Sequence, residues 1–549
     1  MARTGLLALV VLIFFSSGTL QAQLSTASLS GTVVDPSSAG IPSATITLES
    51  TLQKYAREAV TGSEGSYVMP AIPPGKYKLT VRARGFQPEA LAEFSLSSGQ
   101  ATTIDVAMHL AKAGESITVI AAPALLQTTT ATVGQAIDRT EITELPISQR
   151  NVTNLTLLVP GVGARNAPDG GTPQTMYAGG SNPSFYGQRQ RSNNWTLDGV
   201  PVNEPMQNGV VLMPPVDAVS EMKIESGMAS GAYGHAAGAN VNVVSRSGGN
   251  AYHGDGWEYL QNSSLDARSF FTPFIAKYRR NTFGAAVGGP LLIPGLLSKQ
   301  KAWYFYGYYE GLTLRQSGQT SSLFPTTDQL NGNFAAGQSI YQNPKVTPII
   351  YNPYSTVSGP DGTSMRQPFP NNQIPATLLN ASSETLAKLF YAKPNIPYGQ
   401  VAGANFFTTG PVITDGNQWS SRVDHQFGSK HGFFARYSEF RNIDSNAVRP
   451  DLPSNQYRRN TQAVLSDTIT LSPTFVVTGR FGLTRLMWDS LGAANFTIAK
   501  AASTLDTWPK MQGLEIIPRS RSPATQAWPK AIPFMDPSCS SPGSLTRRN

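Results

Sequence analysis

The sequence predicts a mainly β protein with three parts: an N-terminal β-sandwich, an α+β domain, and a partial transmembrane antiparallel β-barrel. Period-two alternation of apolar and polar residues recurs along the 549-residue chain, and Gly, Pro and Ser clusters separate the alternating runs, as expected for strands. Several later runs reach about ten residues, the length of a transmembrane β-strand. Charged residues make up only 14%, against roughly 25% in soluble domains, so an ordinary cytosolic protein is disfavoured.

Composition also limits the chemistry and the partners. The chain has one cysteine, Cys539, and five histidines, so no disulfide framework, metal site or cofactor is expected. The net charge of +8 is spread along the chain, with no basic run longer than a pair. A nucleic-acid partner is therefore not expected, because such proteins cluster their basic residues on one face.

The N-terminus is typical of an exported protein. Arg3 is followed by ten apolar residues at 6–15 and by small residues up to Ala22. This pattern predicts a signal peptide over 1–22. The alternative, a membrane anchor, needs about 20 apolar residues. No later stretch reaches that length, so any membrane insertion after export requires a β-barrel.

The first mature domain is expected over 24–112. Residues 44–49, 76–83 and 102–110 alternate strictly, which predicts a small antiparallel sandwich. The motifs Gly-Thr-Val-Val-Asp at 31–35 and Pro-Gly-Lys-Tyr at 74–77 resemble those of the carboxypeptidase regulatory-like (transthyretin-like) domain. That fold is often classed with carbohydrate-binding modules. The sequence shows no aromatic platform for a glycan, so a spacer role is the expectation.

A linker at 113–124 contains a short β-prone segment, for which two interpretations stay open. It is one more strand of the sandwich, or it resembles the TonB box of outer-membrane transporters, which adds a strand to a partner's sheet edge. The candidate residues are Glu115, Ser116, Ile117, Thr118 and Val119.

The region 125–250 carries three ordered motifs. Val152, Leu155 and Leu158 fall at helical spacing before Pro160-Gly161, which ends the helix. Asp198-Gly199 between apolar residues predicts a hairpin, and a Gly-rich segment closes at 247–249. Together these resemble the plug domain of TonB-dependent receptors, and the motif residues are Leu197, Asp198, Gly199 and Val200.

Barrel strands are expected over 251–500. Trp419, Val423 and Phe427 share one face of the alternating segment 418–427, whose other face is polar and includes Arg422 and Asp424. Segments 283–287 and 474–484 alternate in the same way. The aromatic run 303–309 suggests an interfacial girdle, and 313–417 has the composition of a long extracellular loop. This domain order resembles the Oar-like subgroup of TonB-dependent transporters.

The strand count is low for a plugged barrel. About seven strands are expected between 253 and 485, whereas a plugged barrel has about 22. Residues 501–549 form an irregular tail without alternation. The expectation is therefore a C-terminally incomplete, truncated copy.

Catalytic motifs are not found. The sequence has no phosphate-binding loop, nucleophile elbow or zinc-protease helix, so no catalytic residue is expected. His235 lies in a Gly-rich segment and fits a loop better than a ligand set. The acids Asp198 and Glu204 are attributed to turns.

The resemblance implies an outer-membrane receptor that takes up an unknown extracellular substrate. Its partners would be outer-membrane lipid and the inner-membrane TonB complex, which supplies energy from the proton gradient. Two alternatives remain: a surface adhesion or structural protein on the same scaffold, and a nonfunctional remnant.

Overall fold

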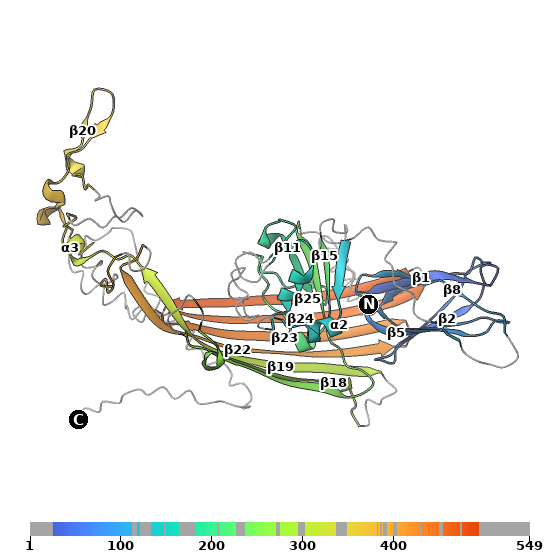
Figure 1. Cartoon of the computed structure of the whole chain (residues 1–549). Helices are drawn as coiled ribbons and strands as arrows, with labels where there is room; N and C mark the ends of the chain where they lie inside the picture. The colour runs from blue at the N-terminus through green and yellow to red at the C-terminus, as the bar shows by residue number, and fades with distance from the viewer. Residues whose placement is uncertain are drawn as a thin grey trace, which may run out of the picture. The chain divides into compact units, whose positions relative to one another are not determined.

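The computed structural model describes residues 26–111, 118–120, 133–147, 150–163, 183–205, 208–226, 237–268, 270, 275–294, 302–335, 349–380, 383–384, 387, 392–398, 403–428, 430–448, 454–472 and 475–492. The chain divides into two compact units, which are described separately. The larger contains Met1–Phe324 and Pro394–Phe496, and the smaller contains Pro325–Lys393 and Thr497–Asn549. Figure 1 shows the course of the chain.

The N-terminal domain of the larger unit consists of two sheets. One has the order β4-β1-β7, with β8 also paired to β1, and the other has the order β3-β2-β5-β6-β9. The strands are β1 (Ala27–Val34), β2 (Thr45–Ser50), β3 (Ala56–Val60), β4 (Ser66–Ile72), β5 (Gly75–Arg82), β6 (Glu89–Leu96), β7 (Ala101–Thr103), β8 (Val106–Ala107) and β9 (Thr118–Ile120).

Strict alternation decides which face of these strands is buried. On β5, Tyr77, Leu79 and Val81 are at most 2% exposed, while Lys76 and Lys78, on either side of Tyr77, are exposed. Period two places alternate side chains on opposite faces of a sheet. The predicted β-sandwich is confirmed, and it has its own apolar core. The expectation of a purely antiparallel sandwich is wrong, because β7 and β8 pair with β1, and β9 with β6, in parallel orientation.

A five-stranded sheet with the order β10-β15-β16-β13-β14 forms the second domain. A two-stranded sheet, β11-β12, and short helices complete it. Its elements are β10 (Val133–Ile137), α2 (Arg139–Glu144), η2 (Val152–Leu158), β11 (Val162–Gly163), β12 (Ser184–Phe185), η4 (Gln190–Ser192), β13 (Asn194–Leu197), β14 (Val200–Pro201), η5 (Val216–Ala218), β15 (Val219–Ser226) and β16 (Ala239–Ser245). Trp195, Met222 and Val243 lie at the centre of its apolar core, each 0% exposed.

The helix predicted around Val152 is a 3₁₀ helix, not an α-helix. Val152 and Leu155 are buried, whereas Leu158 is 52% exposed. The helix ends at Val159, whose N–H bonds to the carbonyl oxygen of Thr156. Spacing of three residues fits a 3₁₀ helix, which has three residues per turn, as well as it fits an α-helix.

Seven long strands form the third part of the larger unit. They pair in sequence order, β17-β18-β19-β22-β23-β24-β25, and each pairing is antiparallel. The strands are β17 (His253–Asn262), β18 (Tyr278–Pro290), β19 (Trp303–Ser322), β22 (Phe406–Phe427), β23 (His431–Asn446), β24 (Ser454–Ser472) and β25 (Phe475–Gly492). The helix η6 (Ser263–Leu265) follows β17. The sheet is not closed within the described residues.

The burial pattern of this sheet is the reverse of a soluble sheet. On β22, Trp419 and Phe427 are 40% and 51% exposed, while the polar Gln418 is 2% exposed. On β25, Phe481 is 63% exposed. An apolar outer face and a polar inner face are typical of transmembrane β-strands. The exposed apolar face predicted for 418–427 is confirmed at Trp419 and Phe427, and that of 474–484 at its described apolar residues Phe475, Val477, Phe481 and Leu483.

The expectation that the aromatic run 303–309 forms an interfacial girdle is only partly correct. Tyr304, Tyr306 and Tyr308 are at most 8% exposed and lie on the inner face, whereas Tyr309 is 43% exposed on the outer face. A seven-residue run in a strand must divide between the two faces. Only its odd-numbered members can contribute to a girdle.

The predicted bounds of the loop, 313–417, include residues at both ends that belong to strands. The strand β19 continues to Ser322 and β22 begins at Phe406, with twenty residue pairs in register between them. Polar, Gly-containing sequence such as 315–320 looks like a loop, but cross-strand pairing holds it in the sheet. None of the helices in the described ranges is long and apolar enough to cross a membrane.

The elements of the smaller unit are short wherever the structure describes it. They are α3 (Thr327–Leu330), η8 (Pro353–Ser355), β20 (Val357–Ser358), β21 (Ser364–Met365), η9 (Pro370–Asn372) and η10 (Ala376–Leu378). The strands β20 and β21 pair with each other in antiparallel orientation. Loop composition in this part of the sequence is consistent with this irregular structure.

Candidate functional site between the second domain and the strand wall

The hairpin at Asp198-Gly199 forms as the sequence predicts. Leu197 pairs with Val200, and the two turn residues have φ of +53° and +75°. Two consecutive positive φ values define a type I′ turn, which favours Asp-Gly. Leu197 and Val200 are 1% and 6% exposed, so the motif's apolar residues anchor the hairpin in the core.

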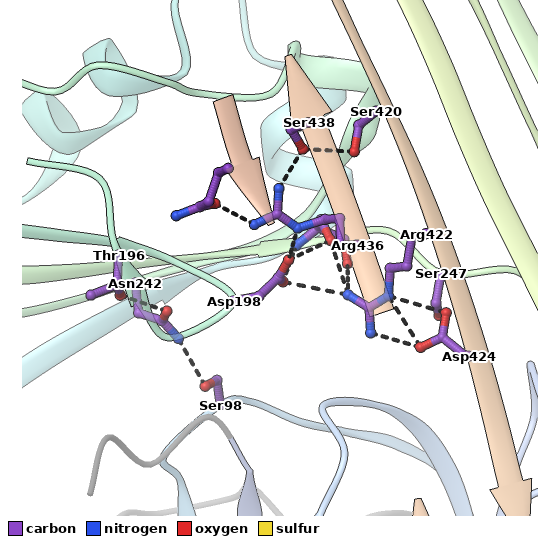
Figure 2. Close-up of polar contacts among 12 residues, drawn as sticks. Ser98, Thr196, Asp198, Asn242, Ser247, Ser420, Arg422, Asp424, Arg436 and Ser438 are labelled. Carbon is purple, nitrogen blue, oxygen red and sulfur yellow. Dashed lines mark hydrogen bonds and ion pairs between the residues drawn. The ribbon is translucent and has the colours of Figure 1, made fainter. Parts of the chain in front are cut away.

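Asp198 does more than make a turn. Its carboxylate is 4% exposed and accepts hydrogen bonds from the N–H and the hydroxyl of Ser245, both at 2.8 Å. The seven-stranded sheet from β17 to β25 is called the wall from here on. Two arginines of the wall also contact Asp198: Arg436 Nε lies 2.6 Å from Oδ2, and Arg422 Nη1 lies 3.4 Å from Oδ1. Figure 2 shows Asp198 between these two guanidinium groups.

The charges around Asp198 keep it ionised. Burial raises the pKa of this carboxyl group, but Arg436, Arg422 and the hydrogen bonds from Ser245 outweigh burial and leave the pKa below its ordinary value. Removing a carboxylate from water is costly unless it is paired and hydrogen-bonded. Here both conditions are met, so the carboxylate of Asp198 in the second domain is held by the cations of the wall.

The contact network continues across the wall. Arg422 on β22 also pairs with Asp424 at 2.8 Å. Arg436 on β23 donates to the hydroxyl of Ser438 and to the side-chain oxygen of Gln462 on β24. One carboxylate of the hairpin is therefore connected to three neighbouring strands of the wall (Figure 2).

Several other contacts between the second domain and the wall are polar. The side-chain amide of Asn460 donates to the carbonyl oxygen of Val211 at 2.5 Å, and the Thr484 hydroxyl donates to that of Pro201 at 3.0 Å. Arg246 pairs with Asp255 at 2.6 Å. Apolar contacts accompany them, because Phe440 of β23 belongs to the core of the second domain and Leu486 of β25 packs against it.

The sandwich also contacts the second domain through a buried acid. The N–H of Ser98 donates to Glu221 Oε1 at 2.9 Å, and the Asn242 side-chain amide donates to the Ser98 hydroxyl at 3.0 Å. Burial raises the pKa of Glu221 to about 7, although the bond from Ser98 opposes the shift. Lys223 lowers this pKa and Asp138 raises it, to a smaller extent.

The linker segment is only partly described. Thr118–Ile120 forms β9, a parallel neighbour of β6 in the sandwich, with Thr118 opposite Glu89 and Val119 opposite Ala90. The other residues proposed as a TonB box, Glu115, Ser116 and Ile117, lie outside the described residues. His235 also lies outside them. The pairing fits the sandwich-strand interpretation, and a TonB-box role stays a prediction.

Two important residues had no predicted role. The alternating pattern predicts Arg422 on the polar face of its strand but no function for it, and no pattern in the sequence singles out Arg436. A buried arginine on the inner face of the wall needs an anionic partner. This rule could have identified Arg422 and Arg436 as residues that bind a carboxylate. Glu204 is 3% exposed and accepts the N–H of Gly209 at 3.1 Å, as a loop acid does.

No group of His, Cys, Asp and Glu that could hold a metal occurs in the part of the chain that the structure describes.

Three family models match the chain. They describe an outer membrane beta barrel domain over residues 244–533, a carboxypeptidase regulatory-like domain over 28–109, and a TonB-dependent receptor plug domain over 112–241. The first alone covers more than half of the chain. The chain belongs to the outer-membrane β-barrel proteins of the TonB-dependent receptor family, and it is Oar-like.

The chain is also similar to individual proteins. The chain is 26% identical over 320 residues to the TonB-dependent transporter Oar of Myxococcus xanthus, and the match covers 55% of this chain and 28% of that protein. Similar solved structures include the ferric enterobactin receptor of Pseudomonas aeruginosa (12% identity, TM-score 0.33, 65% of this chain and 42% of that one). Another is the outer-membrane transporter YddB of Escherichia coli (8% identity, TM-score 0.38, 64% and 38%).

Proposed function

We propose that this chain acts in the uptake of an extracellular substrate across the outer membrane, with energy delivered by the inner-membrane TonB complex. The observation that supports this best is Asp198, which fastens the plug domain to the wall through Arg422 and Arg436. A plug that transports must be held firmly at rest and released under force. A buried ionic contact suits both needs, because its strength depends on geometry and is lost when water enters.

Energy coupling would begin at residues 115–119. This segment is β-prone and follows the sandwich, as a strand-adding motif requires. Within the described residues, Thr118–Ile120 pair with β6, and β9 lies at the edge of its sheet. An edge strand can be exchanged for a partner's sheet edge, so the strand and the TonB-box interpretations are compatible in different states.

The substrate would approach from outside, where loops and the outer face of the plug are exposed. The chain spans 28% of the length of Oar, and its substrate class is open. The sandwich, whose core residues are buried, would act as a spacer between plug and periplasm. No covalent step is assigned to any residue.

Site-directed cross-linking tests the coupling. In a chain with Cys539→Ser, Val119→Cys would be oxidised together with a TonB periplasmic domain that carries its own cysteine. We expect a mixed disulfide with Val119→Cys but not with Lys78→Cys, an exposed position of the same sandwich. Equal yields at the two positions would refute TonB docking here.

A double proline variant separates transport from adhesion. Ile117→Pro with Val119→Pro removes two backbone donors and blocks strand addition. A transporter would lose TonB capture and uptake, whereas a surface adhesion protein on the same scaffold would keep its function. Retained function in this variant would favour the adhesion alternative.

A further inference from the structure

Three arginines gather on the outer face of the wall, away from the plug. Arg441 on β23 lies directly opposite Arg459 on β24 in the antiparallel register. Arg485 on β25 pairs with Thr461 and is therefore a diagonal neighbour of Arg459. All three share the face of Tyr437, Leu465 and Leu483, which are 37%, 47% and 60% exposed. We call Arg441, Arg459 and Arg485 the arginine cluster.

The charge of this cluster is not balanced. Like charges directly opposite on neighbouring strands destabilise a sheet. Glu439 compensates in part, because it pairs with Arg441 and, at 2.7 Å, with Arg459. Asp489 on β25, opposite Tyr457, is a second diagonal neighbour of Arg459 on this face, so three cations and two anions leave a local charge of +1. By contrast, Arg315 on the same face is matched by Asp415 alone, at 2.7 Å.

The cluster lies at one boundary of the apolar band. Below it on β25 come Leu483, Phe481, Val477 and Phe475, each at least 46% exposed. Ten residues separate Arg485 from Phe475, about 34 Å along a strand at about 3.4 Å per residue. With a tilt of about 40°, this corresponds to about 26 Å along the membrane normal, close to the apolar band of about 25 Å in such barrels.

Aromatic side chains mark the same boundary. Trp419 and Tyr437 lie with their rings 5.2 Å apart, and the Tyr437 hydroxyl donates to Glu439 at 3.3 Å. Tyr457, 41% exposed, lies one row further out. Belts of Tyr and Trp occur where the hydrocarbon meets the head groups.

Loop lengths identify this boundary as the outer leaflet. At the other end of the strands, consecutive strands are connected by 291–302, 428–430 and 473–474. At the cluster's end they are connected by 263–277, 323–405 and 447–453, so the longest connections lie at this end. Barrels of the outer membrane have short periplasmic turns and longer extracellular loops.

We propose that the arginine cluster binds the phosphate group of a lipid head group in the outer leaflet. Guanidinium groups bind phosphate with paired, charge-assisted hydrogen bonds, and the lipid would neutralise the uncompensated charge. This inference rests on the outer-membrane placement alone and is independent of TonB coupling. The lipid would hold the wall at a defined depth in the membrane.

Lipid binding to the full chain in neutral detergent tests the proposal. Bound lipid would be counted by native mass spectrometry, with lipid A as the phosphorylated probe and the same lipid stripped of phosphate as its partner. We expect the phosphorylated form to bind at least about tenfold more tightly, and the variant Arg441→Gln, Arg459→Gln, Arg485→Gln to lose this preference. Arg315→Gln is the matched control and should keep it.

Two further measurements keep the test decisive if the triple variant misfolds. Arg485→Gln leaves the Arg441–Glu439–Arg459 contacts in place and should still weaken the preference. Excess inorganic phosphate should not displace the lipid, because a free anion lacks the acyl chains that hold the head group at this depth. Unchanged preference in both arginine variants, equal loss in Arg315→Gln, or displacement by phosphate would each overturn the proposal.

Discussion

Replacing Asp198 by Asn should loosen the plug from the wall. Asn keeps the size of the side chain and one oxygen that can accept from Ser245, but it removes the charge that both arginines face. Its amide group would also point donors at Arg436, where the carboxylate oxygen lies 2.6 Å from Nε. The change therefore isolates the ionic contribution with little effect on packing.

The expected loss is large because the contact is buried. The side chains of Asp198 and Arg436 are 3% and 2% exposed, and breaking a buried pair by removing one partner costs about 3–5 kcal/mol. If this loss appears as easier local opening, amide hydrogen exchange in β13 and β16 should accelerate roughly a hundred- to a few-thousand-fold. Hydrogen–deuterium exchange of the full chain in detergent would measure this acceleration.

Asp415→Asn is the matched control. Its side chain is 43% exposed and pairs with Arg315 on the outer face, so the cost should be about 0–1 kcal/mol. Equal exchange rates in the two variants would refute the proposed anchoring role of Asp198. Adding Arg436→Met to Asp198→Asn should recover part of the loss, because the remaining buried cation is then removed.

Three further predictions concern the same domain. Glu221 has a folded-state pKa of about 7 against an ordinary 4.5, so the folded state holds a proton that the unfolded state loses. The free energy of unfolding should therefore fall, by at most about 3 kcal/mol, as pH rises from 4.5 to 7. Urea unfolding of Glu221→Gln should lack this pH dependence, and an unchanged dependence of the unfolding free energy on pH would contradict the assignment. Gly199→Ala should cost about 1–2 kcal/mol because φ is positive. It should cost more than Gly85→Ala, since a Cβ at 199 would lie 2.0 Å from Arg480 Nη1, whereas a Cβ at 85 meets nothing within 4 Å. Equal unfolding midpoints of the two variants in urea would argue against the contact with Arg480. Leu197→Ala should cost about 2–5 kcal/mol at a 1% exposed position, whereas Val68→Ala, 44% exposed, should change the unfolding midpoint little.

Local sequence patterns predicted most of the secondary structure for a simple reason. Alternation such as that of Tyr77, Leu79 and Val81 depends only on strand geometry, and the Asp198-Gly199 turn depends only on backbone conformation. Two of the corrections show where local patterns are not enough. The spacing of Val152 and Leu155 fits two kinds of helix, and the polar ends of β19 and β22 are strands only because they pair with each other.

The candidate site was predicted in part. The sequence motif predicts Asp198 only as a turn residue. Its partners, Arg422 and Arg436, lie more than 220 positions away in the sequence. Ion pairs of this separation leave no local signal in one sequence. The burial of Glu221 under Ser98 is equally invisible, since both residues have ordinary surface chemistry.

The sequence by itself determined the strand faces, the hairpin and the order of the three parts, because each of these follows from spacing between neighbours along the chain. Only the tertiary structure decided which charges meet. Asp198 becomes an anchor, and not just a turn residue, because the folded wall brings Arg422 and Arg436 within 3.4 Å and 2.6 Å of its oxygens. The arginine cluster likewise exists only through register, which places Arg441 opposite Arg459 and Arg485 beside them.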